Sequence, residues 1–381
     1  MANKLRGAAA IVGIATAGLG EAPGRTAIDL LGEAVHGALR DAGLKITDVD
    51  GLFVNTSAHT HPSSSVAEYL GVRPRFSESS NMGGASFVAY ALTAAAALRA
   101  GLCNVALICY GSNQRTASGR LMAKSGSQDY EAPYQPRHPI TSFALAMARH
   151  MHQYGSTREQ FAAVAVAARQ WAALNPDAFM RGPLSIEDVL SSRMVSDPVT
   201  VRDCCLVTDG AGAVVMVRSD RARDFPNKPA YLLGGGMANW HMQIDQMEDI
   251  TVTAATQSGA DAFAMAGLRP SDVDVAQLYD AFTVNPVLAL EDLGFCAKGE
   301  GGAFVASGAT SPGGSLPVNT NGGGLSFCHP GMYGIFTLIE AATQLRGTAG
   351  ARQVGGVEVA LCHGNGGRLA AQATALFGIE P

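Results

Sequence analysis

The stretch PVNTNGGGLSFCHP, from Pro317 to Pro330, places three glycines shortly before a Cys-His-Pro sequence. Glycine permits tight turns and close approach of backbone segments, so a turn is predicted at residues 322–324. An isolated histidine is more often a buried core residue than a catalytic one. Here the glycine-rich lead and the order of the surrounding motifs favour an active-site position for His329. Its ring could act as an acid or base near neutral pH.

The segments around this stretch alternate between helical and strand-like patterns. In chain order, the second half predicts a helix from Ile250 to Ala266, a strand from Val273 to Tyr279, the glycine turn, a helix from Tyr333 to Leu345, a strand from Val357 to Cys362 and a last strand from Leu369 to Phe377.

The first half has the same order of elements around the loop SNMGGAS, Ser80 to Ser86. Its predicted elements are a buried strand from Ala8 to Ile14, a helix from Thr26 to Ala42, a strand from Asp48 to Val54, a helix from Phe87 to Ala100, a strand from Val105 to Tyr110 and a strand from Asp209 to Val217. The shared order predicts duplication of a βαβ-rich unit, with halves at 1–220 and 221–381. A region at about 112–196 is predicted to be an insertion, with helices at Ser142–Tyr154 and Arg158–Asn175.

Composition limits the class of protein. Hydrophobic residues make up 47% of the 381 residues and 45 residues are glycine, which predicts an α/β body with a large core. The formal net charge of −5, with no basic run, argues against a nucleic-acid partner. Seven cysteines without a CxxC or HExxH motif predict no disulfide framework, no metal site and a cytoplasmic location. No segment approaches the length of a membrane span.

Four motifs in order resemble the thiolase superfamily. They are YDAFTVN (Tyr279–Asn285), GEGGAFV (Gly299–Val305), the opening stretch, and CHGNGG (Cys362–Gly367). The branch that the chain most resembles is the sterol-carrier-protein-type thiolases. This resemblance implies a duplicated thiolase fold of five αβαβα layers with an inserted loop domain.

Family roles carry over to individual positions. The nucleophilic cysteine of the first loop corresponds to Met82, the histidine of the GHP motif to His329, and the second catalytic cysteine to Cys362. The oxyanion-hole loop corresponds to the segment that begins at Tyr279, where the family has Asn or His. The sequence after His329-Pro330 is shortened relative to the family, which places Tyr333 near the site.

The resemblance and the residue types together predict a site with alternatives at several positions. Met82 cannot form a thiolate and reads as a gap-filling residue. Tyr279 and Tyr333 could donate to an oxyanion or take a proton from a substrate hydroxyl, although a tyrosine more often packs. Cys362 could be catalytic, could line the site or could be a buried apolar cysteine. The predicted catalytic residues are His329, Tyr279, Tyr333 and Cys362, and the predicted substrate or coenzyme A contacts are Met82, Asp280, His363, Gly364 and Gly324.

The function that these positions favour is retro-aldol cleavage of a β-hydroxyacyl-CoA, because thiolysis needs the thiolate that Met82 cannot supply. The chain resembles the steroid side-chain-cleaving aldolases, which lack that cysteine. The alternatives are a thiolase-type acyltransferase that uses Cys362 or a partner subunit, and a non-catalytic acyl-CoA or lipid-binding subunit.

The resemblance also implies ligands and partners. Coenzyme A is expected as part of the substrate, not as a tightly bound cofactor. Its phosphates could meet basic residues of the insertion, namely Arg115, Arg120, Lys124 and Arg137. A homodimer and a small zinc-ribbon/OB-fold partner protein are expected.

Overall fold

The computed structural model describes residues 5–56, 58–118 and 131–381. Nine of the described strands form one mixed sheet, and two short strands form a separate two-stranded sheet. The strand order in the nine-stranded sheet is β3-β2-β4-β7-β1-β8-β11-β10-β9. The bounds are β1 Ala9–Gly20, β2 Gly51–Val54, β3 Phe76–Glu78, β4 Val105–Ser112, β7 Asp209–Arg218, β8 Ala230–Asn239, β9 Val275–Leu278, β10 Val359–Gly366 and β11 Ala371–Gly378.

The two halves of this sheet have the same internal order. In the first half, β2 and β4 are parallel, and β4, β7 and β1 are successively antiparallel. In the second half, β9 and β10 are parallel, and β10, β11 and β8 are successively antiparallel. The halves meet where β1 pairs with β8, at Ala10↔Tyr231 and Ile11↔Ala230. The predicted domain boundary at 220/221 falls between β7 and β8 and remains a prediction.

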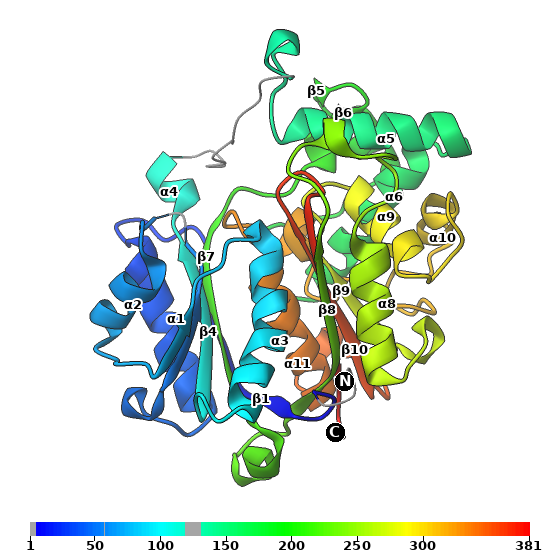
Figure 1. Cartoon of the computed structure of the whole chain (residues 1–381). Coiled ribbons are helices and arrows are strands. Elements are labelled where there is room, and N and C mark those ends of the chain that lie inside the picture. The colour runs from blue at the N-terminus through cyan, green and yellow to red at the C-terminus, as the bar shows by residue number, and fades with distance from the viewer. Residues whose placement is uncertain (1–4, 57, 119–130) are drawn as a thin grey trace.

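Helices form the layers between and outside these strands, and Figure 1 shows the arrangement. Helices α3 and α11 lie between the two halves of the sheet, with α1 and α2 on one outer face and α8 on the other. This confirms the predicted α/β fold with αβαβα layers. The bounds are α1 Ala27–Asp41, α2 Pro62–Leu70, α3 Ser86–Arg99, α8 Ala255–Ala266 and α11 Gly334–Arg346.

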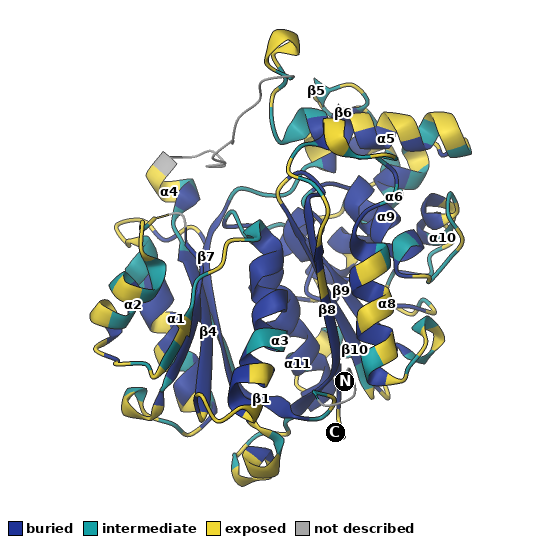
Figure 2. Ribbon diagram, viewed as in Figure 1, coloured by how far each residue is buried: buried dark blue, intermediate teal, exposed yellow. Residues whose placement is uncertain are grey.

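The composition of each helix matches its layer. Helix α3 has the sequence SFVAYALTAAAALR, and its small side chains allow close packing on both faces. Figure 2 shows α3 and α11 buried over most of their length, whereas α1 and α8 expose one face. Helix α1 is amphipathic and begins with a capping box, in which Thr26 and Asp29 satisfy each other's main-chain N–H groups.

The remaining elements lie beyond the carboxyl ends of β4 and β10, at the top of Figure 1 or beside the second half of the sheet. They are α4 Gln114–Ser118, α5 Ile140–Tyr154, α6 Arg158–Ala173, α7 Ile186–Leu190, β5 Met194–Ser196, β6 Val199–Thr200, α9 Val284–Asp292 and α10 Gly301–Ala306. Short helical turns complete the fold, and the one that matters for the site is the π-helical turn η9, Gly323–Phe327. None of the helices in the described residues is long and apolar enough to cross a membrane.

Three differences between the predicted and the observed elements have a clear physical reason. Strand β1 continues to Gly20 instead of ending at Ile14, because its pairing with β7 resumes after a register shift. Strand β8 was not predicted, since its run of three glycines resembles a loop. Helix α8 begins at Ala255 and not at Ile250, because Thr253 is tied outside the helix by two hydrogen bonds to Asp292.

Candidate active site

A cavity of about 180 Å³ lies where the loops of both halves converge. Its wall combines polar groups able to transfer protons or donate hydrogen bonds with apolar side chains. The lining residues are Gly83, Gly84, His138, Pro139, Phe143, Cys205, Met242, Tyr279, Ala281, Phe282, His329, Gly331, Met332, Asn365, Gly367 and Arg368. Two of the four predicted catalytic residues, Tyr279 and His329, are in this wall.

Tyr279 and His329 form a hydrogen-bonded pair. Tyr279 follows the end of β9 and His329 follows the turn η9, and the distance from Tyr279 Oη to His329 Nε2 is 2.9 Å. Both side chains are buried, and the rings meet edge to face at 5.6 Å. His329 is therefore the side-chain partner that the Tyr279 hydroxyl contacts at the cavity wall.

Burial controls the protonation of this pair. It lowers the pKa of His329 to about 4, so the imidazole is neutral at pH 7. It raises the pKa of Tyr279 well above the usual value, so the phenol keeps its proton. With the imidazole proton on Nδ1, Nε2 accepts the Tyr279 O–H; with the proton on Nε2, that nitrogen donates to the phenol. The pair can therefore move a proton in either direction.

Asp280 fixes the backbone turn that precedes His329. Its carboxylate accepts the main-chain N–H groups of Gly324 at 2.6 Å and Leu325 at 3.3 Å, which fixes the turn before His329. Burial raises the pKa of Asp280 to about 7, while these two N–H groups oppose the rise. A Cβ at Gly324 would lie 3.1 Å from Asp280 Oδ1 and 3.2 Å from His329 Cδ2, so a side chain there would press on both groups. Asp280 and Gly324 thus position the loop.

Met82 lies in the loop before α3 with its side chain half-buried. Its main-chain N–H donates to the Ser86 hydroxyl at 2.9 Å, and the Asn55 amide donates to the same oxygen at 3.0 Å. Ser86 is fully buried and accepts both hydrogen bonds, so its hydroxyl holds the loop in place. Neither Met82 nor Ser86 is in the cavity wall, which the next residues, Gly83 and Gly84, reach with their backbone.

The loops around Gly84, Gly334 and Gly366 approach one another closely beside the cavity, with almost no side-chain volume between them. A Cβ at Gly84 would lie 2.1 Å from Cε2 of Tyr279, and one at Gly334 would lie 2.0 Å from the carbonyl oxygen of Gly84. A Cβ at Gly366 would lie 1.7 Å from the carbonyl oxygen of Met82. Glycine is required at all three positions, because each distance is far below a van der Waals contact.

The CHGNGG segment reaches the cavity through a different residue from the predicted ones. Cys362 is fully buried in β10, its S–H donates to the carbonyl of Thr337 at 3.3 Å, and burial raises its pKa. The side chain of His363 is not in the cavity wall; its Nδ1 bonds to Thr374 at 2.9 Å and its Nε2 to Gln372 at 3.0 Å. Gly364 is buried against α3, where a Cβ would lie 2.9 Å from Ala85 Cα.

The residue of that segment in the cavity wall is Asn365. Its amide oxygen accepts a hydrogen bond from the Gln372 amide at 2.9 Å, which leaves its own NH2 group as a donor at the cavity. Cys205 and Met332 also line the cavity and were not singled out from the sequence. Alternation along β10 puts Asn365 on the same face as His363, and both side chains bond to Gln372 of β11.

Tyr333 lies behind Tyr279. Its ring is fully buried, meets the Tyr279 ring edge to face at 5.7 Å, and its hydroxyl donates to Asn321 Oδ1 at 2.7 Å. Tyr333 was predicted to lie near the site, and its ring contacts Tyr279. Only Tyr279 among the two belongs to the cavity wall.

The rim of the cavity carries basic groups that are paired internally. Arg368 donates to Glu131 at 2.8 Å, and His138 Nε2 lies 2.6 Å from the same carboxylate oxygen. Of the four basic residues proposed for coenzyme A phosphates, Arg115 pairs with Glu21 at 2.5 Å and Arg137 is exposed. Arg120 and Lys124 lie outside the described residues. Within the described part of the chain, no group of His, Cys, Asp and Glu side chains could hold a metal ion.

Comparison with known proteins adds to this geometry. The thiolase C-terminal domain-like family matches residues 236–379. The chain is 36% identical to an acetyl-CoA acetyltransferase of Methanothermobacter thermautotrophicus, over 97% of this chain and 98% of that protein. It is 37% identical to a steroid side-chain-cleaving aldolase of Thermomonospora curvata, over 91% and 92%. It is 35% identical to the 17-hydroxy-3-oxo-4-pregnene-20-carboxyl-CoA lyase of Mycobacterium tuberculosis, over 93% and 95%.

Solved structures show the same likeness. The Ltp2-ChsH2(DUF35) aldolase superimposes with a TM-score of 0.90 at 35% identity, covering 98% of both chains. Human mitochondrial 3-ketoacyl-CoA thiolase in complex with CoA gives a TM-score of 0.73 at 17% identity, which is a likeness of fold.

Proposed function

This chain belongs to the thiolase superfamily, and on that premise we propose that it is a carbon–carbon lyase that cleaves a β-hydroxyacyl-CoA by a retro-aldol reaction. One observation carries the proposal. The loop that would hold a nucleophile holds Met82, while the cavity next to that loop keeps the Tyr279 hydroxyl 2.9 Å from His329 Nε2. A retro-aldol cleavage needs a proton acceptor and donors for an enolate, and it forms no acyl-enzyme.

The proposed step uses the tyrosine and histidine as one unit. The β-hydroxyl proton passes to the oxygen of Tyr279, as the phenol proton passes to Nε2 of His329. The electron pair of the O–H bond becomes the carbonyl of the leaving ketone or aldehyde. The bond between the α- and β-carbons breaks, and its electrons form the enolate of the thioester. The α-carbon then takes a proton from Tyr279, which recovers one from His329 Nε2, so the pair returns to its starting state and a shortened acyl-CoA is released.

Charge is balanced within the cavity during this step. His329 becomes positive while the enolate oxygen becomes negative, so each charge lowers the cost of the other in a site of low polarity. The amide NH2 of Asn365 supplies a donor toward the cavity for the enolate oxygen. Burial lowers the pKa of His329 to about 4, so the ring is neutral at pH 7, and the negative charge that forms on the enolate is what favours its protonation.

Cys362 does not suit an acyl-transfer role in this structure. A thiolysis mechanism requires a thiolate, and the pKa of Cys362 is raised by burial, with its S–H bonded to Thr337. The cysteine in the cavity wall, Cys205, also has a pKa raised well above its usual value by burial. These two environments favour the lyase over the acyltransferase alternative.

The similar proteins guide our proposals for the substrate and the partner protein. Two of them are named for cleavage of steroid side chains or of a pregnene-carboxyl-CoA, so we propose a CoA thioester with a bulky β-hydroxyacyl group as substrate. The likeness to the Ltp2-ChsH2(DUF35) aldolase, whose name joins two components, leads us to propose a small DUF35-type partner. We also propose a homodimer in the cytoplasm, and seven free cysteines are in keeping with a reducing compartment.

The test is to incubate the purified protein, alone and with such a partner, with a β-hydroxyacyl-CoA and separately with a β-ketoacyl-CoA plus free CoA. Release of a ketone or aldehyde from the first substrate, quantified by mass spectrometry, is the expected result. CoA-dependent cleavage of the second substrate that disappears in Cys362→Ala would instead establish an acyltransferase. No turnover of either substrate with the partner present would leave the binding-subunit alternative.

A further inference from the structure

The segment Asn319-Thr320-Asn321 precedes the glycine turn, and each of its three side chains is buried and bonded to a different element. Buried polar side chains cost free energy unless their hydrogen bonds are satisfied, so three in succession mark a place where geometry is fixed. The three bonds lead to β9, to α11 and to the residue just before α11. These are the elements that carry Tyr279 and Tyr333.

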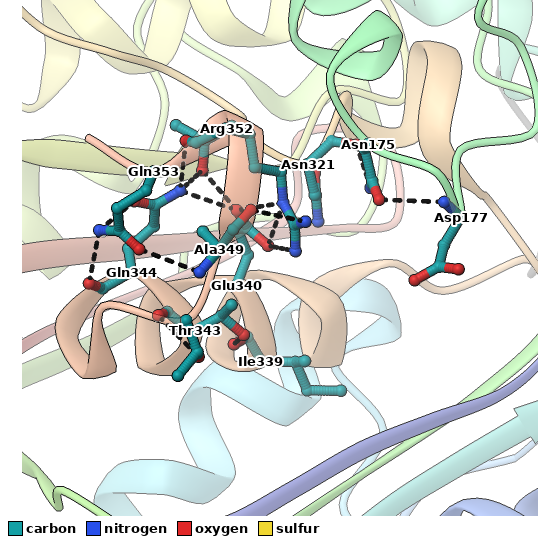
Figure 3. Close-up of polar contacts among 12 residues, drawn as sticks. Asn175, Asp177, Asn321, Ile339, Glu340, Thr343, Gln344, Ala349, Arg352 and Gln353 are labelled. Carbon is teal, nitrogen blue, oxygen red and sulfur yellow. Dashed lines mark hydrogen bonds and ion pairs between the residues drawn. The ribbon is translucent and has the colours of Figure 1, made fainter.

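Asn321 holds Tyr333 directly. Its Oδ1 accepts the Tyr333 O–H at 2.7 Å and the main-chain N–H of Gly323 at 2.8 Å. Its main-chain carbonyl accepts the Asn175 amide at 2.9 Å, and Asn175 is itself fixed by the N–H of Asp177 at 3.1 Å. Figure 3 shows Asn175, Asp177 and Asn321 side by side. Asn321 is therefore restrained at both its side chain and its main chain.

The two neighbours of Asn321 fix the surrounding framework. Asn319 Oδ1 accepts the main-chain N–H of Leu278 at 2.7 Å, the residue before Tyr279. Thr320 donates to Glu340 Oε1 at 2.7 Å, and Arg352 pairs with the same carboxylate at 3.0 Å. Figure 3 shows Glu340 and Arg352 facing each other beside α11. The segment thus ties β9 and α11 to one short piece of backbone.

Tyr333 in turn contacts Tyr279 through its ring. The two rings lie edge to face, with their centroids 5.7 Å apart and their planes at 87°. On the other side, Gly84 leaves no space for the Tyr279 ring to move, because even a Cβ there would be 2.1 Å from it. The position of the Tyr279 hydroxyl therefore depends on where Tyr333 is held.

We propose that Asn321 is a positioning residue, which fixes Tyr333 and through it the direction of the Tyr279 hydroxyl toward His329. The inference rests on the proposed function, in which Tyr279 and His329 move the proton. It assigns Tyr333 a role that is exerted through Tyr279, since its own hydroxyl proton is donated to Asn321.

The kinetic test compares Asn321→Ala with Asn321→Asp, which keeps an acceptor oxygen in the same place. We expect Asn321→Ala to lower kcat by about 10- to 100-fold with KM nearly unchanged, because a small misplacement of a catalytic group has this cost. Asn321→Asp should recover most of that loss. Adding Tyr333→Phe to Asn321→Ala should lower kcat little further, since both changes remove the same interaction. Additive losses would overturn the proposal.

The matched control is Asn227→Ala, which removes an amide bonded to Asp41 at 2.9 Å, far from the cavity. It should leave kcat unchanged. A measurement without substrate separates this inference from the proposed function. Fluorotyrosine is placed at position 279 and its ¹⁹F signal is recorded in each variant. The signal should move in Asn321→Ala and not in Asn227→Ala. An unchanged signal in Asn321→Ala overturns the positioning role, whether or not the wild-type protein cleaves the substrate.

Discussion

At the scale of single residues, the site consists of a few polar groups whose neighbours decide their chemistry. The sequence placed Tyr279 and His329 among the predicted catalytic residues, because each lies in a motif that resembles the family, and in the structure Tyr279 Oη lies 2.9 Å from His329 Nε2. It could not predict that Tyr333 donates to Asn321 while Asn365 faces the cavity. Side-chain direction in a loop depends on the tertiary partners of the loop, and those come from distant parts of the chain.

Replacing Tyr279 by Phe removes the hydroxyl that bridges the substrate and His329. We expect kcat for retro-aldol cleavage to fall by about 10²- to 10⁴-fold, the usual contribution of general acid–base catalysis, with a small change in KM. Steady-state kinetics with a β-hydroxyacyl-CoA measure this effect. Tyr231→Phe, at a buried tyrosine of β8 outside the cavity wall, is the matched control and should retain activity. Full activity in Tyr279→Phe would exclude the phenol from the mechanism.

Replacing Cys362 by Ala should affect stability more than activity. The thiol is fully buried and bonded to the carbonyl of Thr337, so its loss should lower the free energy of unfolding by about 1 to 2 kcal/mol. Denaturant unfolding checks this value, and kcat should stay within a few-fold of wild type. A kcat reduced to background in a folded Cys362→Ala protein would contradict the lyase assignment.

At the scale of elements, the site depends on glycines that let three loops meet. The periodic helices and apolar strands were predicted well, since their patterns reflect burial on one or both faces. Strand β8 was missed because its three glycines carry no hydrophobic pattern; Cβ atoms at Gly234 and Gly236 would lie 2.1 and 2.3 Å from carbonyl oxygens of α8. That close packing of strand on helix appears only once both elements are placed.

Gly84→Ala should disturb catalysis through this packing. The added Cβ would lie 2.1 Å from the Tyr279 ring, so the ring or the loop must shift. We expect a loss of about 1 to 3 kcal/mol in the free energy of unfolding from overpacking. The fall in kcat should be at least about 10-fold, because the Tyr279 hydroxyl moves away from His329. Gly355→Ala, where a Cβ meets nothing within 4 Å, should change neither quantity. Equal effects of the two variants would show that the close approach is unimportant.

At the scale of the whole molecule, the duplicated sheet places the site between its two halves. The loop before α3 comes from the first half, whereas Tyr279, His329 and Asn365 come from the second. The repeated order of glycine loop, helix and strand predicted this duplication, and the matching strand orders bear it out. The pairing of β1 with β8, which joins the halves into one sheet, was not predictable, because it covers two residue pairs and β8 has no pattern of its own.

The buried titratable groups predict how stability depends on pH. His329 and His363 each have a pKa lowered to about 4, so between pH 6.5 and 4 the unfolded chain binds protons that the native protein does not. Stability should fall with falling pH in that window. Asp280 has its pKa raised to about 7, so the native protein binds a proton there that the unfolded chain does not. Its contribution to stability therefore rises with falling pH and cancels roughly the contribution of one histidine. The net loss from pH 7 to pH 4 should be roughly 2 to 3 kcal/mol.

Urea unfolding at several pH values measures this dependence. His363→Gln should flatten the slope below pH 6.5, because it removes one of the two buried histidines, and Asp280→Asn should steepen it. His36→Gln, at an exposed histidine, is the control and should leave the slope unchanged. A slope that is the same in His363→Gln as in wild type would refute the assignment of the pH dependence to the buried histidines.

The junction at Gly84, Gly334 and Gly366 also limits how this protein can diverge. None of the three can gain a side chain unless a neighbouring backbone segment moves, since each Cβ would overlap a carbonyl oxygen or a ring. The side chain of Met82 lies outside the cavity wall, so exchange of that residue alone does not change the lining of the cavity. A designer who wishes to recover covalent acyl transfer has to reorient that loop, because exchanging Met82 for Cys alone would leave the sulfur outside the cavity.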